Sequence, residues 1–260
     1  MKRKKESPRE GDTTRKVLFV SPVLLGLVVA TVLVTGCDVP TVCCPTGVAY
    51  DSNYDWVCPS YCPGGGTSVI TWDVIFTDNK NNERCDPGDI RISIRNITDN
   101  VDLPTQSLNP SQGNYHGEQV IHLTKDTEFG LNITGESCSY SGTKTIPVRV
   151  VSEGRFITVV RNGKLTYPGM TFTNIPVKAG PGVKVEKVQN LNPFDIVVTK
   201  DTIIEVIPKG ETGTAFQHRD VDANGPWSLG LTSEDDFSIY NNQMPDPNLS
   251  VNIYLRCNCH

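Results

Sequence analysis

The chain has 260 residues, with 24 Lys and Arg against 29 Asp and Glu for a net charge of −5, and it contains 9 Cys. This length allows one large domain or two of ordinary size. Hydrophobic residues make up 37% of the chain and include many Val and Ile, which argues against a disordered protein. The acidic balance argues against a protein that binds nucleic acid.

The N-terminus is basic and then apolar. The first sixteen residues contain seven Lys or Arg and three Asp or Glu, and the run from Val17 to Val34 carries no charge. Thr35, Gly36 and Cys37 follow directly. A positive segment, an apolar stretch and small residues in this order are typical of a secretory signal.

The end of the apolar run, Val34-Thr35-Gly36-Cys37, resembles the lipobox of bacterial lipoproteins. This resemblance implies that residues 1–36 are a signal peptide and that Cys37 becomes an acylated N-terminus. The protein would then be anchored by lipid in the bacterial cell envelope, facing the periplasm or the exterior. Asp38 resembles the signal that retains some lipoproteins in the inner membrane.

An uncleaved signal anchor is the alternative, because 18 apolar residues at 1.5 Å each span about 27 Å, close to the thickness of a bilayer core. Cleavage after Gly36 would leave 224 residues with a net charge of −9. Both alternatives attach an acidic body to the outer side of the cytoplasmic membrane.

Residues 37–66 are rich in cysteine, and we expect them to form a linker or cap. Four aromatic residues in this segment allow two interpretations, either an exposed stacking surface for a sugar or a protein, or a small core packed over disulfides. We favour the core. These aromatic residues are Tyr50, Tyr54, Trp56 and Tyr61.

Short alternating or β-branched runs, separated by Asn, Asp, Gly and Pro, fill the rest of the chain. In the first half they are Val69 to Thr77, Ile90 to Ile97, Gln119 to Leu123, Thr127 to Thr134 and Thr145 to Val151. In the second half they are Phe156 to Val160, Met170 to Val177, Val183 to Val188, Phe194 to Thr199, Thr202 to Ile207 and Leu249 to Arg256. The pattern predicts an all-β protein with two immunoglobulin-like β-sandwich domains, at residues 67–151 and 152–260.

Two runs in the first domain resemble fibronectin type III and related bacterial immunoglobulin-like domains. Thr67 to Val74 is similar to their second strand, in which a Trp packs into the core, and Thr127 to Gly135 is similar to their sixth strand. Cys85 and Cys138 lie outside these two runs, which departs from the usual bridge between the sheets of an immunoglobulin domain.

The segment Asp220-Val-Asp222-Ala-Asn224-Gly225 fits the first positions of a calcium loop, where alternating oxygen donors converge. The twelfth position is Leu231 rather than Glu, so the segment is not an EF-hand. A β-hairpin loop that binds calcium and a polar turn without metal are the two alternatives, and the turn is favoured.

Eight cysteines follow Cys37, and in an exported chain we expect them to form disulfides. They are Cys43, Cys44, Cys58, Cys62, Cys85, Cys138, Cys257 and Cys259. Cys257 and Cys259 share one face of the last predicted strand, where their separation of about 6.6 Å opposes a bridge between them. Cys43 and Cys44 are adjacent and also unsuited to pairing. The simplest assignment joins Cys85 to Cys138, and joins the last two cysteines to the group between residues 43 and 62.

Zinc is the alternative for these cysteines. Cys58 and Cys62 have ligand-like spacing, and Cys257-Asn-Cys259-His260 offers three donors. An oxidising compartment favours disulfides over metal.

No motif for a nucleophile, a metalloprotease or a phosphate-binding loop occurs in the sequence. The function that we expect is therefore a non-enzymatic binding or structural module of the envelope, without a cofactor, for a protein or glycan partner. The alternative is an envelope hydrolase, or its substrate-binding accessory, with catalytic residues dispersed along the chain.

Overall fold

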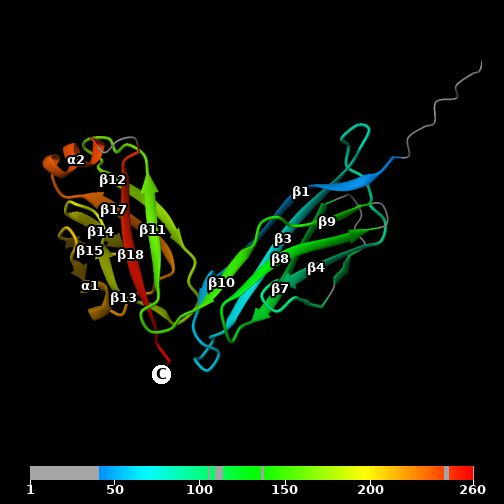
Figure 1. Ribbon diagram of the computed structural model, residues 1–260, viewed down its shortest axis with the longest axis horizontal. Helices are drawn as coiled ribbons and strands as arrows, with labels where there is room; N and C mark the ends of the chain where they lie inside the picture. Colours follow the sequence, from blue (N-terminus) through cyan, green and yellow to red (C-terminus); the bar gives the residue numbers. More distant parts are fainter. Residues whose placement is uncertain (1–40, 105, 109–113, 136–137, 243–245, 260) are drawn as a thin grey trace, which may run out of the picture. The chain divides into compact units, whose positions relative to one another are not determined.

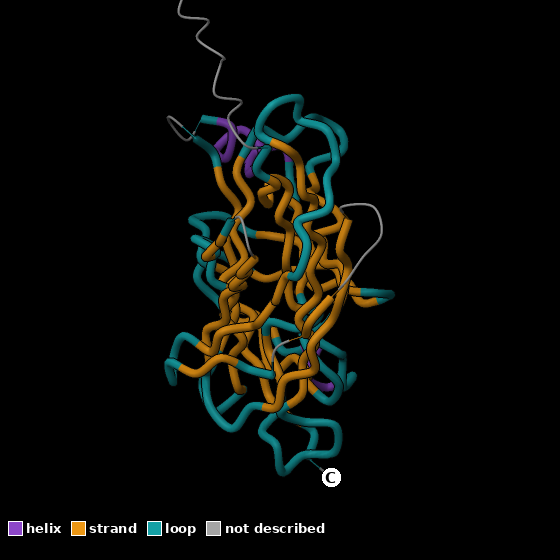
Figure 2. The backbone as a smooth tube through the Cα atoms, turned by 90° about the vertical axis from the view of Figure 1, so that its right-hand side faces the viewer, coloured by secondary structure: helices purple, strands orange, loops and turns teal. Residues whose placement is uncertain are grey.

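The computed structural model describes residues 41–104, 106–108, 114–135, 138–242 and 246–259. Strands dominate this part of the chain, and its two helices are short (Figure 2). Neither helix has both the length and the apolar character needed to cross a membrane. The predicted signal peptide, the apolar run of the alternative anchor and the lipidation site Cys37 lie outside the described residues.

The strands of the first half form two sheets, seen in Figure 1. One has the order β1-β3-β7, and the other has the order β2-β10-β8-β4-β5, with β6 beside β4 and β9 beside β8. The pairing is antiparallel except between β2 and β10. The bounds are β1 Cys43–Ser52, β2 Trp56–Val57, β3 Thr67–Asp78, β4 Ile90–Asn96, β5 Val101–Asp102, β6 Gln106–Leu108, β7 Asn114–His122, β8 Thr127–Gly135, β9 Ser139–Ser141 and β10 Ile146–Val150.

Both of these sheets contribute side chains to one core. Ile70, Trp72 and Val74 alternate along β3 and are buried, as expected when every second side chain faces inward. Leu131 on β8 and Val148 on β10 enter the same core from the other sheet. The two sheets therefore face each other across apolar side chains.

The second half forms two further sheets, with the orders β11-β18-β13-β16 and β12-β17-β14-β15. In Figure 1 the red strand β18 lies between β11 and β13. The bounds are β11 Phe156–Asn162, β12 Thr171–Val177, β13 Val183–Asn190, β14 Ile196–Lys200, β15 Ile203–Ile207, β16 Thr212–Gly213, α1 Ala215–His218, β17 Gly225–Leu231, α2 Glu234–Asn241 and β18 Asn248–Cys257. A second core lies between these sheets, with Val251 and Ile253 of β18 and Trp227 and Leu229 of β17 among its buried residues.

The segment assigned to a cysteine-rich cap is not separate from the sheets. Its residues 43–52 form β1 and pair with β3 along their length, so that Tyr50 lies opposite Trp72. This strand was not predicted, because Pro45 and Gly47 interrupt its sequence pattern. The register of β1 shifts between these two residues, which marks a bulge.

Four disulfides join cysteines of the described residues, and the predicted pair Cys85–Cys138 is wrong. Cys85 is joined to Cys43, and Cys138 is joined to Cys44. Neighbouring residues of a strand point to opposite faces, so the two adjacent cysteines of β1 reach different segments. The other two bridges are Cys58–Cys257 and Cys62–Cys259. The last two cysteines thus have separate partners in the N-terminal group, as expected.

Candidate functional site

Strand β7 is an edge strand of its sheet. Leu123 N donates to Gly66 O at 2.5 Å, directly after the paired segment of β7. Hydrogen-bonded and non-bonded positions alternate along an antiparallel pair, so the N–H and C=O groups of His122 and Val120 point away from β3. The side-chain amide of Gln119 donates to Val120 O at 2.9 Å, which agrees with this direction.

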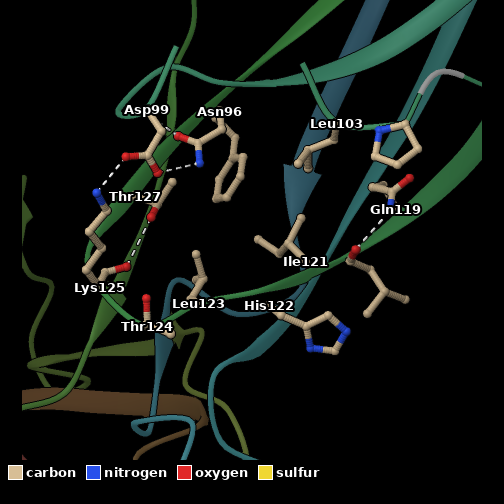
Figure 3. Close-up of a pocket in the computed structure, with 13 residues that line it drawn as sticks. Asn96, Asp99, Leu103, Gln119, Ile121, His122, Leu123, Thr124, Lys125 and Thr127 are labelled. Atoms are coloured by element: carbon tan, nitrogen blue, oxygen red, sulfur yellow. Dashed lines mark hydrogen bonds and ion pairs between the residues drawn. The ribbon is translucent and has the colours of Figure 1, made fainter. Parts of the chain in front are cut away.

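A groove of about 390 Å³ runs beside this edge (Figure 3). Ile121 and Leu123, on the inward face of the β7 segment, lie in its floor and are buried. Phe129 of β8 and Leu103, which follows β5, add apolar surface from the other sheet. The groove therefore opens between the edges of the two sheets, and its floor is continuous with their shared core.

The far rim of the groove is polar and held by hydrogen bonds, drawn as dashed lines in Figure 3. Lys125 Nζ lies 2.6 Å from Asp99 Oδ1, and Asn96 Nδ2 donates to Asp99 Oδ2 at 2.9 Å. The hydrogen bond from Lys125, with that from Asn96 second, lowers the pKa of Asp99 below its ordinary value. The carboxylate of Asp99 is thus already occupied by two donors of the protein.

The histidine side chains of β7 belong to its outward face. His116 Nδ1 lies 2.9 Å from Asp73 Oδ1, in an exposed pair across two strands. His122 Nδ1 lies 3.4 Å from Thr67 Oγ1. Neither contact places a histidine beside Asp99. The groove combines an apolar floor with an edge strand whose backbone groups at Val120 and His122 point away from β3, an arrangement that suits an extended peptide.

The predicted calcium ligands Asp220, Asp222 and Asn224 bind donors of the protein. Lys184 Nζ lies 3.0 Å from Asp222 Oδ1 and 3.5 Å from Asp220 Oδ2, and Arg256 also pairs with Asp220. Asn224 Oδ1 accepts a hydrogen bond from a backbone N–H at 3.2 Å. The ion pair with Asp222 raises the pKa of Lys184, so an ammonium group occupies the position between the two carboxylates.

The aromatic residues of the cysteine-rich segment are mostly packed. Tyr50 is buried in the first core, and its hydroxyl donates to Lys144 O. Tyr54 packs partly against the first core and Trp56 against the second. Tyr61 is the exception, with 81% of its surface exposed. The four rings therefore do not form a common stacking surface.

The sulfur atoms of three predicted disulfide partners lie close together. The Sγ atoms of Cys58, Cys62 and Cys257 are all within 4.8 Å of one another. Cys259 joins this cluster through its bridge to Cys62.

Comparison of this chain with known protein families, with curated proteins and with solved structures finds no match. The groove was not predicted from the sequence, because its residues come from separate segments. One signal was available: the alternation that places Ile121 and Leu123 inward also places the polar Gln119 inward. A polar residue in that position indicates that the face is open there.

Proposed function

We propose that this chain is a membrane-anchored lipoprotein of the bacterial cell envelope, without enzymatic activity, that binds an extended segment of a partner protein beside β7. The observation that carries the proposal is the edge of β7, where the backbone groups of Val120 and His122 point away from β3 beside an apolar floor. An extended peptide supplies both backbone partners for the edge and side chains for the floor. The floor holds aliphatic side chains and a buried Phe129, which favours a peptide over a sugar that needs an exposed aromatic face.

The strand order supports an immunoglobulin-like fold for residues 67–151 together with β1. Constant-type immunoglobulin domains place their strands A, B and E in one sheet and C, F and G in the other. In this chain β1, β3 and β7 share one sheet, while β4, β8 and β10 share the other. We propose that residues 152–260 form a second sandwich, because their two sheets enclose a core of their own.

Anchoring through Cys37 is tested by intact-mass analysis of the protein from a membrane fraction. The proposal expects an N-terminus at Cys37 with added acyl mass, whereas a retained Met1 would support the uncleaved anchor instead. A Cys37→Ser variant, which cannot be acylated, controls for adventitious lipid. Loss of the added mass in this variant is the expected result.

Binding at the groove is tested by replacing Val120 with a photo-crosslinking amino acid in cells that produce the protein. Val160 of β11 is a matched control, because both valines are on edge strands and their exposed fractions are 46% and 47%. The proposal expects a discrete adduct at position 120 and none at position 160. The partner peptide in the adduct is then identified by mass spectrometry.

A second pair of variants separates the backbone of the edge from its side chains. Val120→Pro removes an N–H that points away from β3, whereas Val120→Thr keeps it. A crosslinker at the neighbouring position 122 should lose its adduct in the Pro variant and keep it in the Thr variant. Adducts of equal yield at positions 120 and 160, or an unchanged adduct in the Pro variant, would refute binding at this edge.

A further inference from the structure

Two bridges join the turn at residues 58–62 to the end of β18 and gather four sulfur atoms in one place. Three of these atoms, from Cys58, Cys62 and Cys257, lie within 4.8 Å of one another. The fourth belongs to Cys259 and is bonded to that of Cys62. Cys58 and Cys62 are almost fully buried, with 1% and 4% of their surfaces exposed.

The spacing of these atoms fits a tetrahedral metal centre. Zinc–sulfur bonds of about 2.3 Å place the sulfurs of a four-thiolate site about 3.8 Å apart. The bridged Cα atoms are 5.6 Å apart for Cys58–Cys257 and 4.5 Å apart for Cys62–Cys259, so each pair must open slightly. Cys259 lies beyond the end of β18 and is free of its ladder, which allows this movement.

We propose that the reduced chain binds one Zn²⁺ through the thiolates of Cys58, Cys62, Cys257 and Cys259. The metal and the two disulfides are then alternative ways to hold the same junction between the turn and the last strand. This inference does not rest on the groove beside β7 or on the lipid anchor.

The chemistry balances with a water-soluble phosphine as the reductant. Each disulfide takes up two electrons and two protons and becomes two thiols, while the phosphine is oxidised to its oxide with an oxygen from water. Binding of the cation then releases the four thiol protons, since thiolates are the ligands. The same four sulfurs cannot form bridges while they hold the metal.

The other four cysteines provide an internal control. Cys43 and Cys44 point to opposite faces of β1, so their partners Cys85 and Cys138 lie on different sides of that strand. Four sulfurs arranged in this way cannot converge on one ion. Reduction therefore creates eight thiols but a single four-thiolate site.

The test is a titration of the full-length chain, reduced with phosphine under nitrogen, with Co²⁺ as a spectroscopic probe for zinc. We expect one Co²⁺ per chain, with a thiolate-to-cobalt charge-transfer band and tetrahedral d–d bands that disappear when Zn²⁺ is added. The double variant Cys58→Ser/Cys257→Ser should lose these bands. The matched double variant Cys43→Ser/Cys85→Ser should keep them.

A second measurement on the unsubstituted chain covers the case in which a variant does not fold. The reduced protein is alkylated with and without Zn²⁺, and the modified cysteines are mapped by mass spectrometry. Zinc should protect Cys58, Cys62, Cys257 and Cys259 and leave the other cysteines reactive. Absence of the cobalt bands in the unsubstituted chain, their persistence in Cys58→Ser/Cys257→Ser, or equal alkylation of the eight cysteines that form the bridges would overturn the proposal.

Discussion

Asn190 shows how much of the second core depends on a single polar side chain. It is 1% exposed, and its Nδ2 group lies 2.8, 3.0 and 3.1 Å from the carbonyl oxygens of Phe194, Ile207 and Pro208. Its Oδ1 atom accepts from both the backbone N–H and the side-chain amide of Asn192 at 2.8 Å. One amide therefore satisfies groups from two segments, residues 192–194 and 207–208, in the protein interior.

We predict that Asn190→Ala lowers the free energy of unfolding by about 3 to 5 kcal/mol, because each buried group left without a partner costs about 1 to 3 kcal/mol. Chemical denaturation followed by tryptophan fluorescence measures this change. The control Asn81→Ala removes an exposed amide and should change stability by less than about 0.5 kcal/mol. Equal effects of the two substitutions would contradict the role assigned to Asn190.

Asp99, at the rim of the groove, gives a prediction about pH. The hydrogen bond from Lys125 is the largest cause that lowers its pKa, and the one from Asn96 is the second. In the folded protein the pKa of this carboxyl group is therefore below its ordinary value of 3.8. The contribution of this ion pair to the stability of the folded state is complete above pH 3.8 and is lost as the pH falls through the lowered pKa. Because both side chains are exposed, the pair orders the rim and adds little stability.

The corresponding measurement is an NMR titration of the Asp99 carboxyl carbon. We expect a midpoint below 3.8 in the unsubstituted chain and a higher midpoint in Lys125→Gln. Lys80→Gln removes an exposed lysine elsewhere and should leave the midpoint in place. A midpoint that Lys125→Gln does not move would show that the ion pair is absent in solution.

At the scale of the element, helix α2 illustrates a local signal that hydrophobic periodicity misses. Ser233 caps this helix: its Oγ accepts from Asp236 N at 3.1 Å and donates to Asp236 Oδ2 at 2.6 Å. Acidic residues fill the first turn, where they face the positive end of the helix dipole. The helix has 8 residues, too few to show three turns of an apolar stripe.

We predict that Ser233→Ala destabilises the protein by about 1 kcal/mol through loss of this cap. Ser238, which is exposed inside the same helix, provides the control, because Ser238→Ala loses no cap and improves helix propensity. Thermal unfolding monitored by circular dichroism compares the two variants. A Ser238→Ala variant that is as unstable as Ser233→Ala would exclude the capping effect.

Strands in which every second side chain is buried are among the elements that were predicted correctly. Buried side chains alternate with less buried ones along β3 and β18, and the observed bounds of both strands match the predicted runs within two residues. In β7 only the residues from Gln119 onward were predicted, because Gly117 occupies an inward position where an apolar residue is usual. The strand β17 was missed because Gly225 and Pro226 begin it.

The candidate site was less predictable than the strands, since it depends on which edges meet in space. Lys125 and Asp99 are 26 residues apart, and no local pattern connects them. The disulfides show the same limit: adjacency argued against pairing of Cys43 with Cys44 but could not select their partners. Pairing depends on which strands are neighbours in the sheets, and the sequence pattern predicts strands without their order.

At the scale of the whole molecule, two bridges close almost the same loop of the chain. Cys58–Cys257 and Cys62–Cys259 have sequence separations of 199 and 197 residues. When either bridge is present, the second closes only a small ring formed by the turn and the end of β18. Their contributions to stability should therefore not be independent.

Loop entropy gives the expected size of this dependence. A bridge that closes a loop of 199 residues restricts the unfolded chain and stabilises the folded state by about 5 kcal/mol. A bridge that closes a ring of about eight residues stabilises it by about 2.5 kcal/mol. Removal of either bridge alone, in Cys58→Ser/Cys257→Ser or in Cys62→Ser/Cys259→Ser, should thus cost about 2.5 kcal/mol, since the remaining bridge still closes the long loop. Removal of both should cost about 8 kcal/mol, which exceeds the sum of the two single losses by about 3 kcal/mol. Equilibrium denaturation without reductant measures all three variants, and strictly additive losses would mean that the two bridges constrain different parts of the unfolded chain.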